Sequence, residues 1–221
     1  MIWEQEVSVV VMLTRLNEAG RQLCHRYWPA GADSDCERQQ LAPGAGEQQP
    51  ARSASNKLLV ALELASGAHG AKRASRLEVH LVSEHVSSPD YLVRNMYLIN
   101  KSSGESRTLT QFHYLAWPEG RAPDKVRSLL HFRRKLHKCF RAPESPLLVH
   151  SSEGAGRAGT FALIDLILER IRLGAKEIDL RATLEHLRDQ RVGLCANQQQ
   201  FEFVLVALAE EIQIILNALP Q

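Results

Sequence analysis

The chain has 221 residues, of which 44% are hydrophobic and 24% charged, and its formal net charge is +2. This composition is typical of a soluble globular protein that is long enough for one domain with a substantial core. The near-neutral charge gives no electrostatic reason to expect nucleic-acid binding. No apolar run approaches the roughly 18 residues of a membrane span, and the acidic start, Met1–Glu6, is unlike a secretory signal. We therefore predict a single domain over residues 1–221 without a membrane segment.

The first half of the chain is rich in strand patterns. Val7–Leu13 is β-branched and almost continuously apolar, which predicts a buried strand. From about 31 to 75 the composition shifts to Ala, Gly, Gln, Ser and Pro, which is typical of a flexible low-complexity insertion. Within that insertion, the apolar run Leu58–Leu64 is interpreted as a short helix.

Regular patterns resume after the insertion. Leu77–Val82 alternates like a strand. Tyr91–Ile99 and Arg107–Leu115 are two further strands, and the turn-forming cluster Asn100–Glu105 between them predicts a hairpin.

The second half is mainly helical. The pattern predicts a helix over Asp124–Phe140, a short buried strand over Pro146–His150, and helices over Arg157–Leu173, Asp179–Gln190 and Gln200–Leu219. Asp179 is the expected N-cap of one helix, while Gly174 and Gly193 are expected to end two of them. Together the elements predict an α/β class, with a mixed sheet flanked by helices.

Four cysteines are scattered along the chain: Cys24, Cys36, Cys139 and Cys195. None forms a CxxC pair or lies near a histidine at metal-ligand spacing. We predict free thiols in a reducing compartment, with no metal site and no cofactor.

The segment from Ser151 to Arg157 joins a predicted strand to a predicted helix and contains Gly154 and Gly156. Glycines let successive backbone N–H groups turn inward, and the start of the helix adds partial positive charge, so the segment resembles an anion cradle. Arg157 could bind two phosphate oxygens with its guanidinium fork. An ordinary glycine-rich turn remains the alternative.

Two nucleotide-binding motifs overlap this loop. Gly154, Gly156 and Gly159 match the dinucleotide fingerprint, and Asp179 follows about 20 residues later. Asp179, however, is predicted to begin a helix instead of ending a second parallel strand. The NTPase phosphate loop also fits poorly, because the required lysine is missing. A dinucleotide-binding domain is therefore the weaker alternative.

The segment Val149–Gly159 resembles the His-Cys-x-x-Gly-x-Gly-Arg-(Ser/Thr)-Gly signature of protein tyrosine phosphatases, and Trp117-Pro118-Glu119 resembles their mobile Trp-Pro-Asp loop. Longer motifs are similar to the receptor-type phosphatase-like N family, the islet autoantigen and phogrin proteins: Arg107–His113, Lys176–Asp179, Glu185–Arg191 and Ala218–Gln221. The resemblance covers nearly everything except the insertion. His113 and His186 fall within these motifs and are interpreted as hydrogen-bonded structural histidines.

The resemblance implies that the catalytic positions are degenerate. Ser151 stands where the family has its cysteine nucleophile, and a serine needs an adjacent general base that the sequence does not show. Glu119 replaces the general-acid aspartate, and Ala196 replaces the glutamine that positions water. Ala158 replaces a hydroxyl residue, and Glu153 brings a negative charge to the cradle. The predicted phosphate loop comprises Ser151, Ser152, Glu153, Gly154, Ala155, Gly156 and Arg157.

The resemblance also implies that the chain starts late, because the family's first helices and phosphotyrosine-recognition loop precede the Met1–Glu4 motif. The expected fold is thus a phosphatase-like domain that lacks its N-terminal part.

Three functional hypotheses follow. The leading one is a non-enzymatic interaction domain on the cytosolic face of a dense-core secretory vesicle, acting in regulated secretion. Its implied partners are other phosphatase domains, by homo- or heterodimerisation, and cytoskeletal or granule adaptors. The chain alone would be soluble and cytoplasmic. The second hypothesis is a weak tyrosine phosphatase or a phosphotyrosine-binding trap, and the third is a fragment without independent function.

Overall fold

The computed structural model describes residues 1–29, 57–61, 76–139 and 145–218. Most of the predicted insertion, together with Cys36, lies outside these residues. Cys24, Cys139 and Cys195 are free thiols, as predicted.

A six-stranded mixed sheet forms the centre of the fold, in the order β4-β5-β6-β7-β1-β8. β5, β6 and β7 are antiparallel neighbours, while β1 runs parallel to both β7 and β8. The strands are β4 (Lys57–Ala61), β5 (Arg76–Ser88), β6 (Tyr91–Asn100), β7 (Ser106–Tyr114), β1 (Val9–Met12) and β8 (Leu147–His150). This topology confirms the predicted mixed sheet and the hairpin of β6 and β7.

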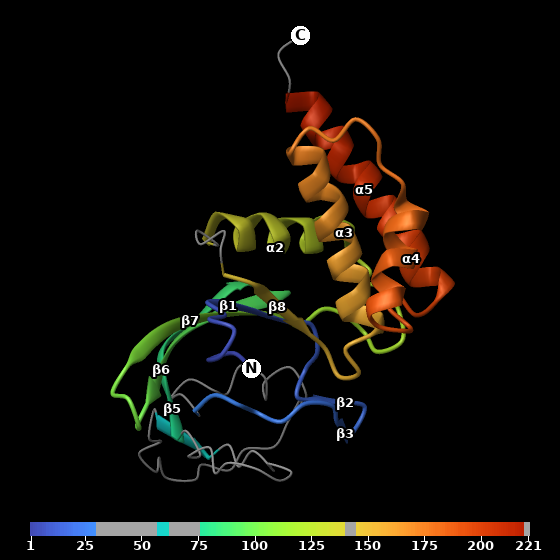
Figure 1. Cartoon of the computed structure of the whole chain (residues 1–221). Coiled ribbons are helices and arrows are strands. Elements are labelled where there is room, and N and C mark those ends of the chain that lie inside the picture. The colour runs from blue at the N-terminus through green and yellow to red at the C-terminus, as the bar shows by residue number, and fades with distance from the viewer. Residues whose placement is uncertain (30–56, 62–75, 140–144, 219–221) are drawn as a thin grey trace.

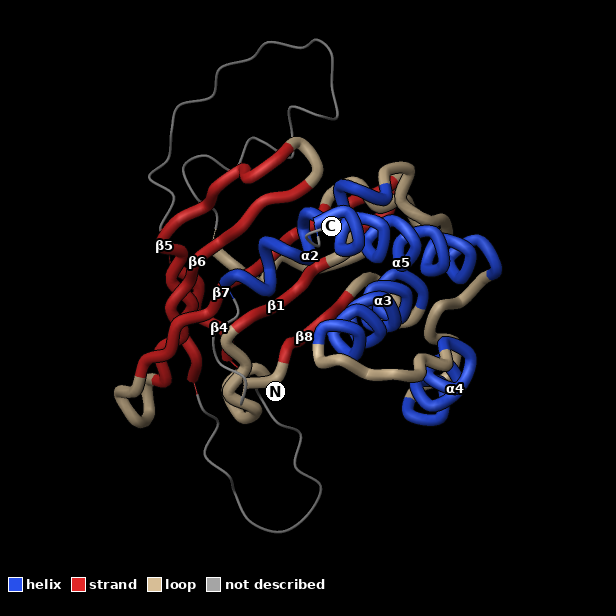
Figure 2. The backbone as a smooth tube through the Cα atoms, turned by 90° about the horizontal axis from the view of Figure 1, so that it is seen from above, coloured by secondary structure: helices blue, strands red, loops and turns tan. Residues whose placement is uncertain are grey.

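The helices lie on one side of the sheet (Figure 1). They are α2 (Val126–Cys139), α3 (Gly156–Arg172), α4 (Leu180–Gln190) and α5 (Gln198–Ala218). Seen from above, α2 crosses the sheet, α3 and α5 run beside each other, and α4 packs on the outer side of α3 (Figure 2). A separate small hairpin, β2 (Asn17–Glu18) and β3 (Arg21–Gln22), lies on the other side of the sheet from the helices.

Strand β1 is buried on both faces, which explains its unbroken apolar sequence. Val9 and Val11 belong to the core between the sheet and the helices. Val10 and Met12 point to a second apolar cluster on the opposite face, which includes Trp28. The prediction of a buried strand here is confirmed.

Two predictions about strands need correction. Pro146–His150 was expected to be buried, but β8 is only half-buried, because among the described strands it is the last of the sheet and pairs with β1 alone. Leu58–Leu64 was expected to be helical. Its described part lies in β4, which pairs antiparallel with β5, so pairing at the sheet edge overrides the local preference.

The signals that begin α4 and end α3 are confirmed, but the prediction that Gly193 ends α4 is wrong. α4 ends at Gln190, and its C-cap Arg191 is already extended, two residues before Gly193. Asp179 is the N-cap of α4, and its side chain accepts a hydrogen bond from the Ala182 backbone N–H at 2.9 Å. Gly174 follows the end of α3 with a φ of 78°, a left-handed conformation that glycine adopts without strain.

Candidate functional site

The candidate site lies where β8 gives way to α3. β8 ends at His150 and α3 begins at Gly156, so the predicted phosphate loop spans the connection. Gly154 has a φ of 69°, which favours glycine. Ala155 occupies the N-cap of α3, and no side chain caps the helix. The first N–H groups of α3 are therefore left for another acceptor.

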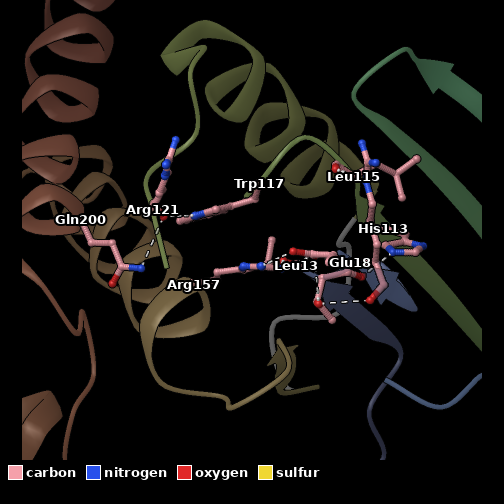
Figure 3. Close-up of polar contacts among 10 residues, drawn as sticks. Leu13, Glu18, His113, Leu115, Trp117, Arg121, Arg157 and Gln200 are labelled. Atoms are coloured by element: carbon pink, nitrogen blue, oxygen red, sulfur yellow. Dashed lines mark hydrogen bonds and ion pairs between the residues drawn. The ribbon is translucent and has the colours of Figure 1, made fainter. Parts of the chain in front are cut away.

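Arg157 is held by a bidentate ion pair that the sequence did not suggest (Figure 3). Its Nη1 and Nη2 donate to the two carboxylate oxygens of Glu18 at 2.7 and 2.6 Å, and Nη1 also donates to the Leu13 carbonyl at 3.2 Å. Only 4% of the Arg157 side chain is exposed. These bonds fix the guanidinium at the base of the loop.

Glu18 reaches Arg157 because of the β2–β3 hairpin. Its two central residues, Ala19 and Gly20, both have positive φ, as in the tight turns that match the twist of a hairpin. Burial alone would raise the pKa of the Glu18 carboxyl, but the hydrogen bonds and charge of Arg157 outweigh burial and lower the pKa. Glu18 is therefore ionised at neutral pH and offsets the positive charge of Arg157.

Residues 194–197, the last part of the connection between α4 and α5, pack closely against the loop. A Cβ on Gly159 would lie 2.5 Å from the Cys195 backbone nitrogen, so only glycine fits there. The Cys195 N–H donates to the Ala155 carbonyl at 3.3 Å. Ala196 donates its N–H to the Gln200 side chain at 2.9 Å, and Gln200 is only 2% exposed.

A third segment, residues 116–121, carries Glu119 to the same place. Trp117 is buried in the helical core, and its indole N–H donates to the Arg121 carbonyl at 2.8 Å. Gln200 contacts the same carbonyl at 3.5 Å (Figure 3). Trp117 therefore anchors residues 116–121 by its packing and by one hydrogen bond.

These three segments surround a pocket of about 220 Å³. It brings together three positions that the sequence analysis singled out on separate segments, Glu119, Ser151 and Ala196. The rest of its lining is Gly120, Ser152, Glu153, Gly156, Arg157, Asn197 and Gln200. Gly154 and Ala155 belong to the loop but do not line the pocket. The sequence analysis missed Glu18, Asn197 and Gln200, whose partners are set by tertiary contacts.

The Ser151 hydroxyl has no base beside it among the described residues. Its oxygen accepts a hydrogen bond from the Gly154 backbone N–H at 3.2 Å. The neighbouring His150 is engaged elsewhere, because its Nε2 lies 2.8 Å from the Tyr27 hydroxyl, to which Gln111 donates at 2.6 Å. Burial lowers the pKa of His150, with a smaller opposing effect of the Ser151 backbone.

The loop does not have the setting of a dinucleotide site. The acidic residue expected on a ribose, Asp179, instead caps α4, and α3 is followed by helices and not by a second parallel strand. Among the described residues there is also no group of three potential metal ligands.

The sequence matches the family model described as protein-tyrosine phosphatase over residues 1–51 and 65–210. The chain belongs to the protein-tyrosine phosphatase family. Its fold is the phosphatase-like α/β fold expected for this family.

Named relatives of this phosphatase domain are receptor-type proteins. The chain is 44% identical to receptor-type tyrosine-protein phosphatase N2 of Mus musculus and 45% identical to receptor-type tyrosine-protein phosphatase-like N of Homo sapiens, over all of its length. It is 44% identical over 99% of its length to receptor-type tyrosine-protein phosphatase-like ida-1 of Caenorhabditis elegans. It spans 18, 19 and 23% of these relatives, respectively. No helix in the described part of this chain has the length and apolar character of a membrane span.

Proposed function

We propose that this chain is a catalytically inactive tyrosine-phosphatase-like domain that serves as a protein-interaction module. The observation that carries the proposal is the state of Ser151. Its oxygen accepts a hydrogen bond from the Gly154 N–H, and no described imidazole or carboxylate is bonded to it. A serine hydroxyl is a weak nucleophile unless a base removes its proton.

The surroundings of Ser151 support the same proposal. The Nε2 of His150, its nearest imidazole in sequence, is hydrogen-bonded to the Tyr27 hydroxyl and not to Ser151. Glu119 and Ala196 line the pocket in place of the acid and the water-positioning residue. Glu153 is exposed at the pocket, where its charge disfavours an anionic substrate, although water screens this repulsion.

The retained architecture favours a binding role. Arg157 forms a buried ion pair with Glu18, and Gly159 packs closely against Leu194 and Cys195. The loop between β8 and α3 is therefore well packed, although it lacks a catalytic nucleophile. By resemblance to the receptor-type relatives, we place the domain on the cytosolic face of dense-core vesicles in regulated secretion. The proposed partners are other phosphatase domains or cytoskeletal and granule adaptors.

Hydrolysis of an aryl phosphate by the purified chain tests the loss of activity. We expect the wild type and Ser151→Ala to be indistinguishable, because the serine hydroxyl has no base. Ser151→Cys restores the thiolate and shows whether the rest of the pocket can still support turnover. Wild-type turnover that disappears in both Ser151→Ala and Arg157→Ala would overturn the proposal.

A phosphate-binding trap is the second candidate function, and Arg157 is the observation that favours it. Its bonds to Glu18 and Leu13 use Nη1 and one N–H of Nη2. The Nε–H and the other Nη2 N–H form a second fork, and Arg157 lines the pocket beside the uncapped start of α3. Such a group could hold a phosphate that Ser151 cannot attack.

Calorimetric titration with tungstate tests this second candidate. A trap requires saturable binding that Arg157→Lys weakens and that Glu153→Gln strengthens, because the exposed carboxylate no longer repels the anion. Absence of any binding heat in the wild type and in Glu153→Gln would exclude the trap and leave the interaction module as the function.

A further inference from the structure

The segment that carries Glu119 is hydrogen-bonded to the residue that precedes α5. The Asn197 side chain donates a hydrogen bond from Nδ2 to the Gly120 carbonyl at 2.9 Å. One residue further on, the Arg121 carbonyl accepts from the Trp117 indole and lies 3.5 Å from the Gln200 amide nitrogen. The loop is thus bonded at both of the residues that follow Glu119.

Asn197 has a second bond on its other atom. Its Oδ1 accepts from the Gln200 backbone N–H at 2.9 Å, and Asn197 immediately precedes α5, which starts at Gln198. Oδ1 therefore caps the helix, while Nδ2 bonds the loop. The oxygen of this amide bonds α5 and its nitrogen bonds the loop. A substitution at Asn197 can therefore remove the bond to the loop and leave the cap of α5 in place.

We propose that Asn197 is a positioning residue that holds residues 116–121, and with them Glu119, in place as a fixed wall of the pocket. Gln200 helps to fix Asn197, because its backbone N–H donates to Asn197 Oδ1. Its buried side chain also accepts from the Ala196 N–H and contacts the Arg121 carbonyl. Loops of this kind that take part in catalysis must open and close. Here the bond from Asn197 keeps the pocket in one preformed shape.

Asn197→Asp separates this role from helix capping. The aspartate keeps an oxygen for the Gln200 N–H, and Asp and Asn are comparable N-caps. It cannot donate to the Gly120 carbonyl. Asn197→Ser also keeps a capping oxygen, but it is too short to reach the loop and adds no charge. Asn197→Ala removes both bonds, and Gln198→Ala alters only an exposed bond to Glu202 on the same turn.

The measurement is limited cleavage by trypsin of the Arg121–Ala122 bond in the folded chain, quantified by mass spectrometry. Arg121 is exposed within the loop, and under native conditions the rate reports the population of the opened loop. Loss of one hydrogen bond should raise that rate about fivefold in both Asn197→Asp and Asn197→Ser. Because the same bond stabilises the native state, their melting temperatures should fall by about 2–4 °C, less than that of Asn197→Ala, which also loses the cap. Gln198→Ala should match the wild type in both respects.

Several results would overturn the proposal. Unchanged cleavage in Asn197→Asp and Asn197→Ser would show that the bond to Gly120 does not hold the loop. Faster cleavage in the aspartate variant alone would assign the effect to the added charge. Melting temperatures as low as that of Asn197→Ala would leave capping as the whole role. Because no substrate is used, the outcome is independent of whether the domain is catalytically active.

Discussion

At the scale of single residues, Arg157 and Ser151 lie in the same loop but differ in how firmly their side chains are bonded. Arg157 is almost fully buried and held by both oxygens of Glu18. Ser151 occupies the adjoining wall of the pocket with only a backbone N–H as its described partner. A buried arginine is expensive to leave without its counter-ion, so its retention follows from stability whether or not the loop performs chemistry.

The Glu18–Arg157 pair gives the first prediction. Glu18→Gln should lower the free energy of unfolding by about 3 kcal/mol, because it leaves the buried guanidinium without a counter-ion. Urea denaturation measures this loss. The matched control is Glu185→Gln, which breaks an exposed pair with Arg181 and should leave the free energy of unfolding almost unchanged. Equal losses in the two variants would contradict a stabilising role for the buried pair.

At the scale of secondary-structure elements, local signals were sufficient where they act within a few residues. The cap at Asp179 is satisfied three residues later, at Ala182. The β6–β7 hairpin closes across a turn whose Gly104 N–H donates to the Asn100 carbonyl. Such contacts depend on neighbouring residues, so the sequence pattern predicts them.

The errors and omissions concern contacts between distant segments. Strand β4 is defined by its pairing with β5. The partial exposure of β8 follows because the described part of the chain supplies no strand on its other edge. Glu18 lies 139 residues from Arg157, and no spacing rule links them. For the same reason, the sequence did not indicate a special role for Asn197. Its bond to Gly120 joins residues 77 positions apart and forms only in the folded chain.

The cap of α4 gives a prediction at this scale. Asp179→Ala removes the acceptor of the Ala182 N–H and should cost about 1 kcal/mol, which lowers the melting temperature by about 2–4 °C in a domain of this size. Asp189→Ala, near the exposed end of the same helix, is the control and should leave the melting temperature within error. A larger shift in the control than in Asp179→Ala would refute the capping role.

At the scale of the whole molecule, a buried polar network connects the sheet to the segment before β4. Arg94 is paired with Glu84, donates to Gln111 and His113, and stacks over Trp28 with 4.1 Å between its guanidinium carbon and the ring centre. His113 is fully buried and bonds the Thr14 carbonyl at 2.7 Å, which confirms its structural role. Folding therefore requires a neutral imidazole at His113.

This network predicts how stability depends on pH. Burial, with the nearby charge of Arg94, lowers the pKa of His113 to about 3. In the unfolded chain the imidazole binds a proton below its ordinary pKa of about 6.5, and the folded chain does not. The free energy of unfolding should therefore fall as pH decreases from about 6.5 towards 3, by about 1.4 kcal/mol per pH unit from this group. The lowered pKa values of Glu18 and Asp165 add to the loss in acid.

Urea denaturation between pH 6.5 and 4 measures this dependence. His113→Gln removes the titrating group and should flatten the pH dependence by about 1.4 kcal/mol per pH unit. Leu109→Ala, a buried substitution on the same strand, destabilises the domain but keeps His113, so it should retain the wild-type slope. A His113→Gln slope equal to that of Leu109→Ala would show that another group dominates.

The position of β1 has a consequence for biosynthesis. This strand is synthesised before both of its partners, β7 and β8, and Val9 pairs with both Thr110 and Leu147. At the usual rate of translation, β8 emerges on the order of ten seconds after β1. Until β7 emerges, this apolar strand has neither neighbour, and until β8 emerges one of its edges remains unpaired. Nascent chains should therefore bind chaperones through Val7–Leu13 until β8 is complete.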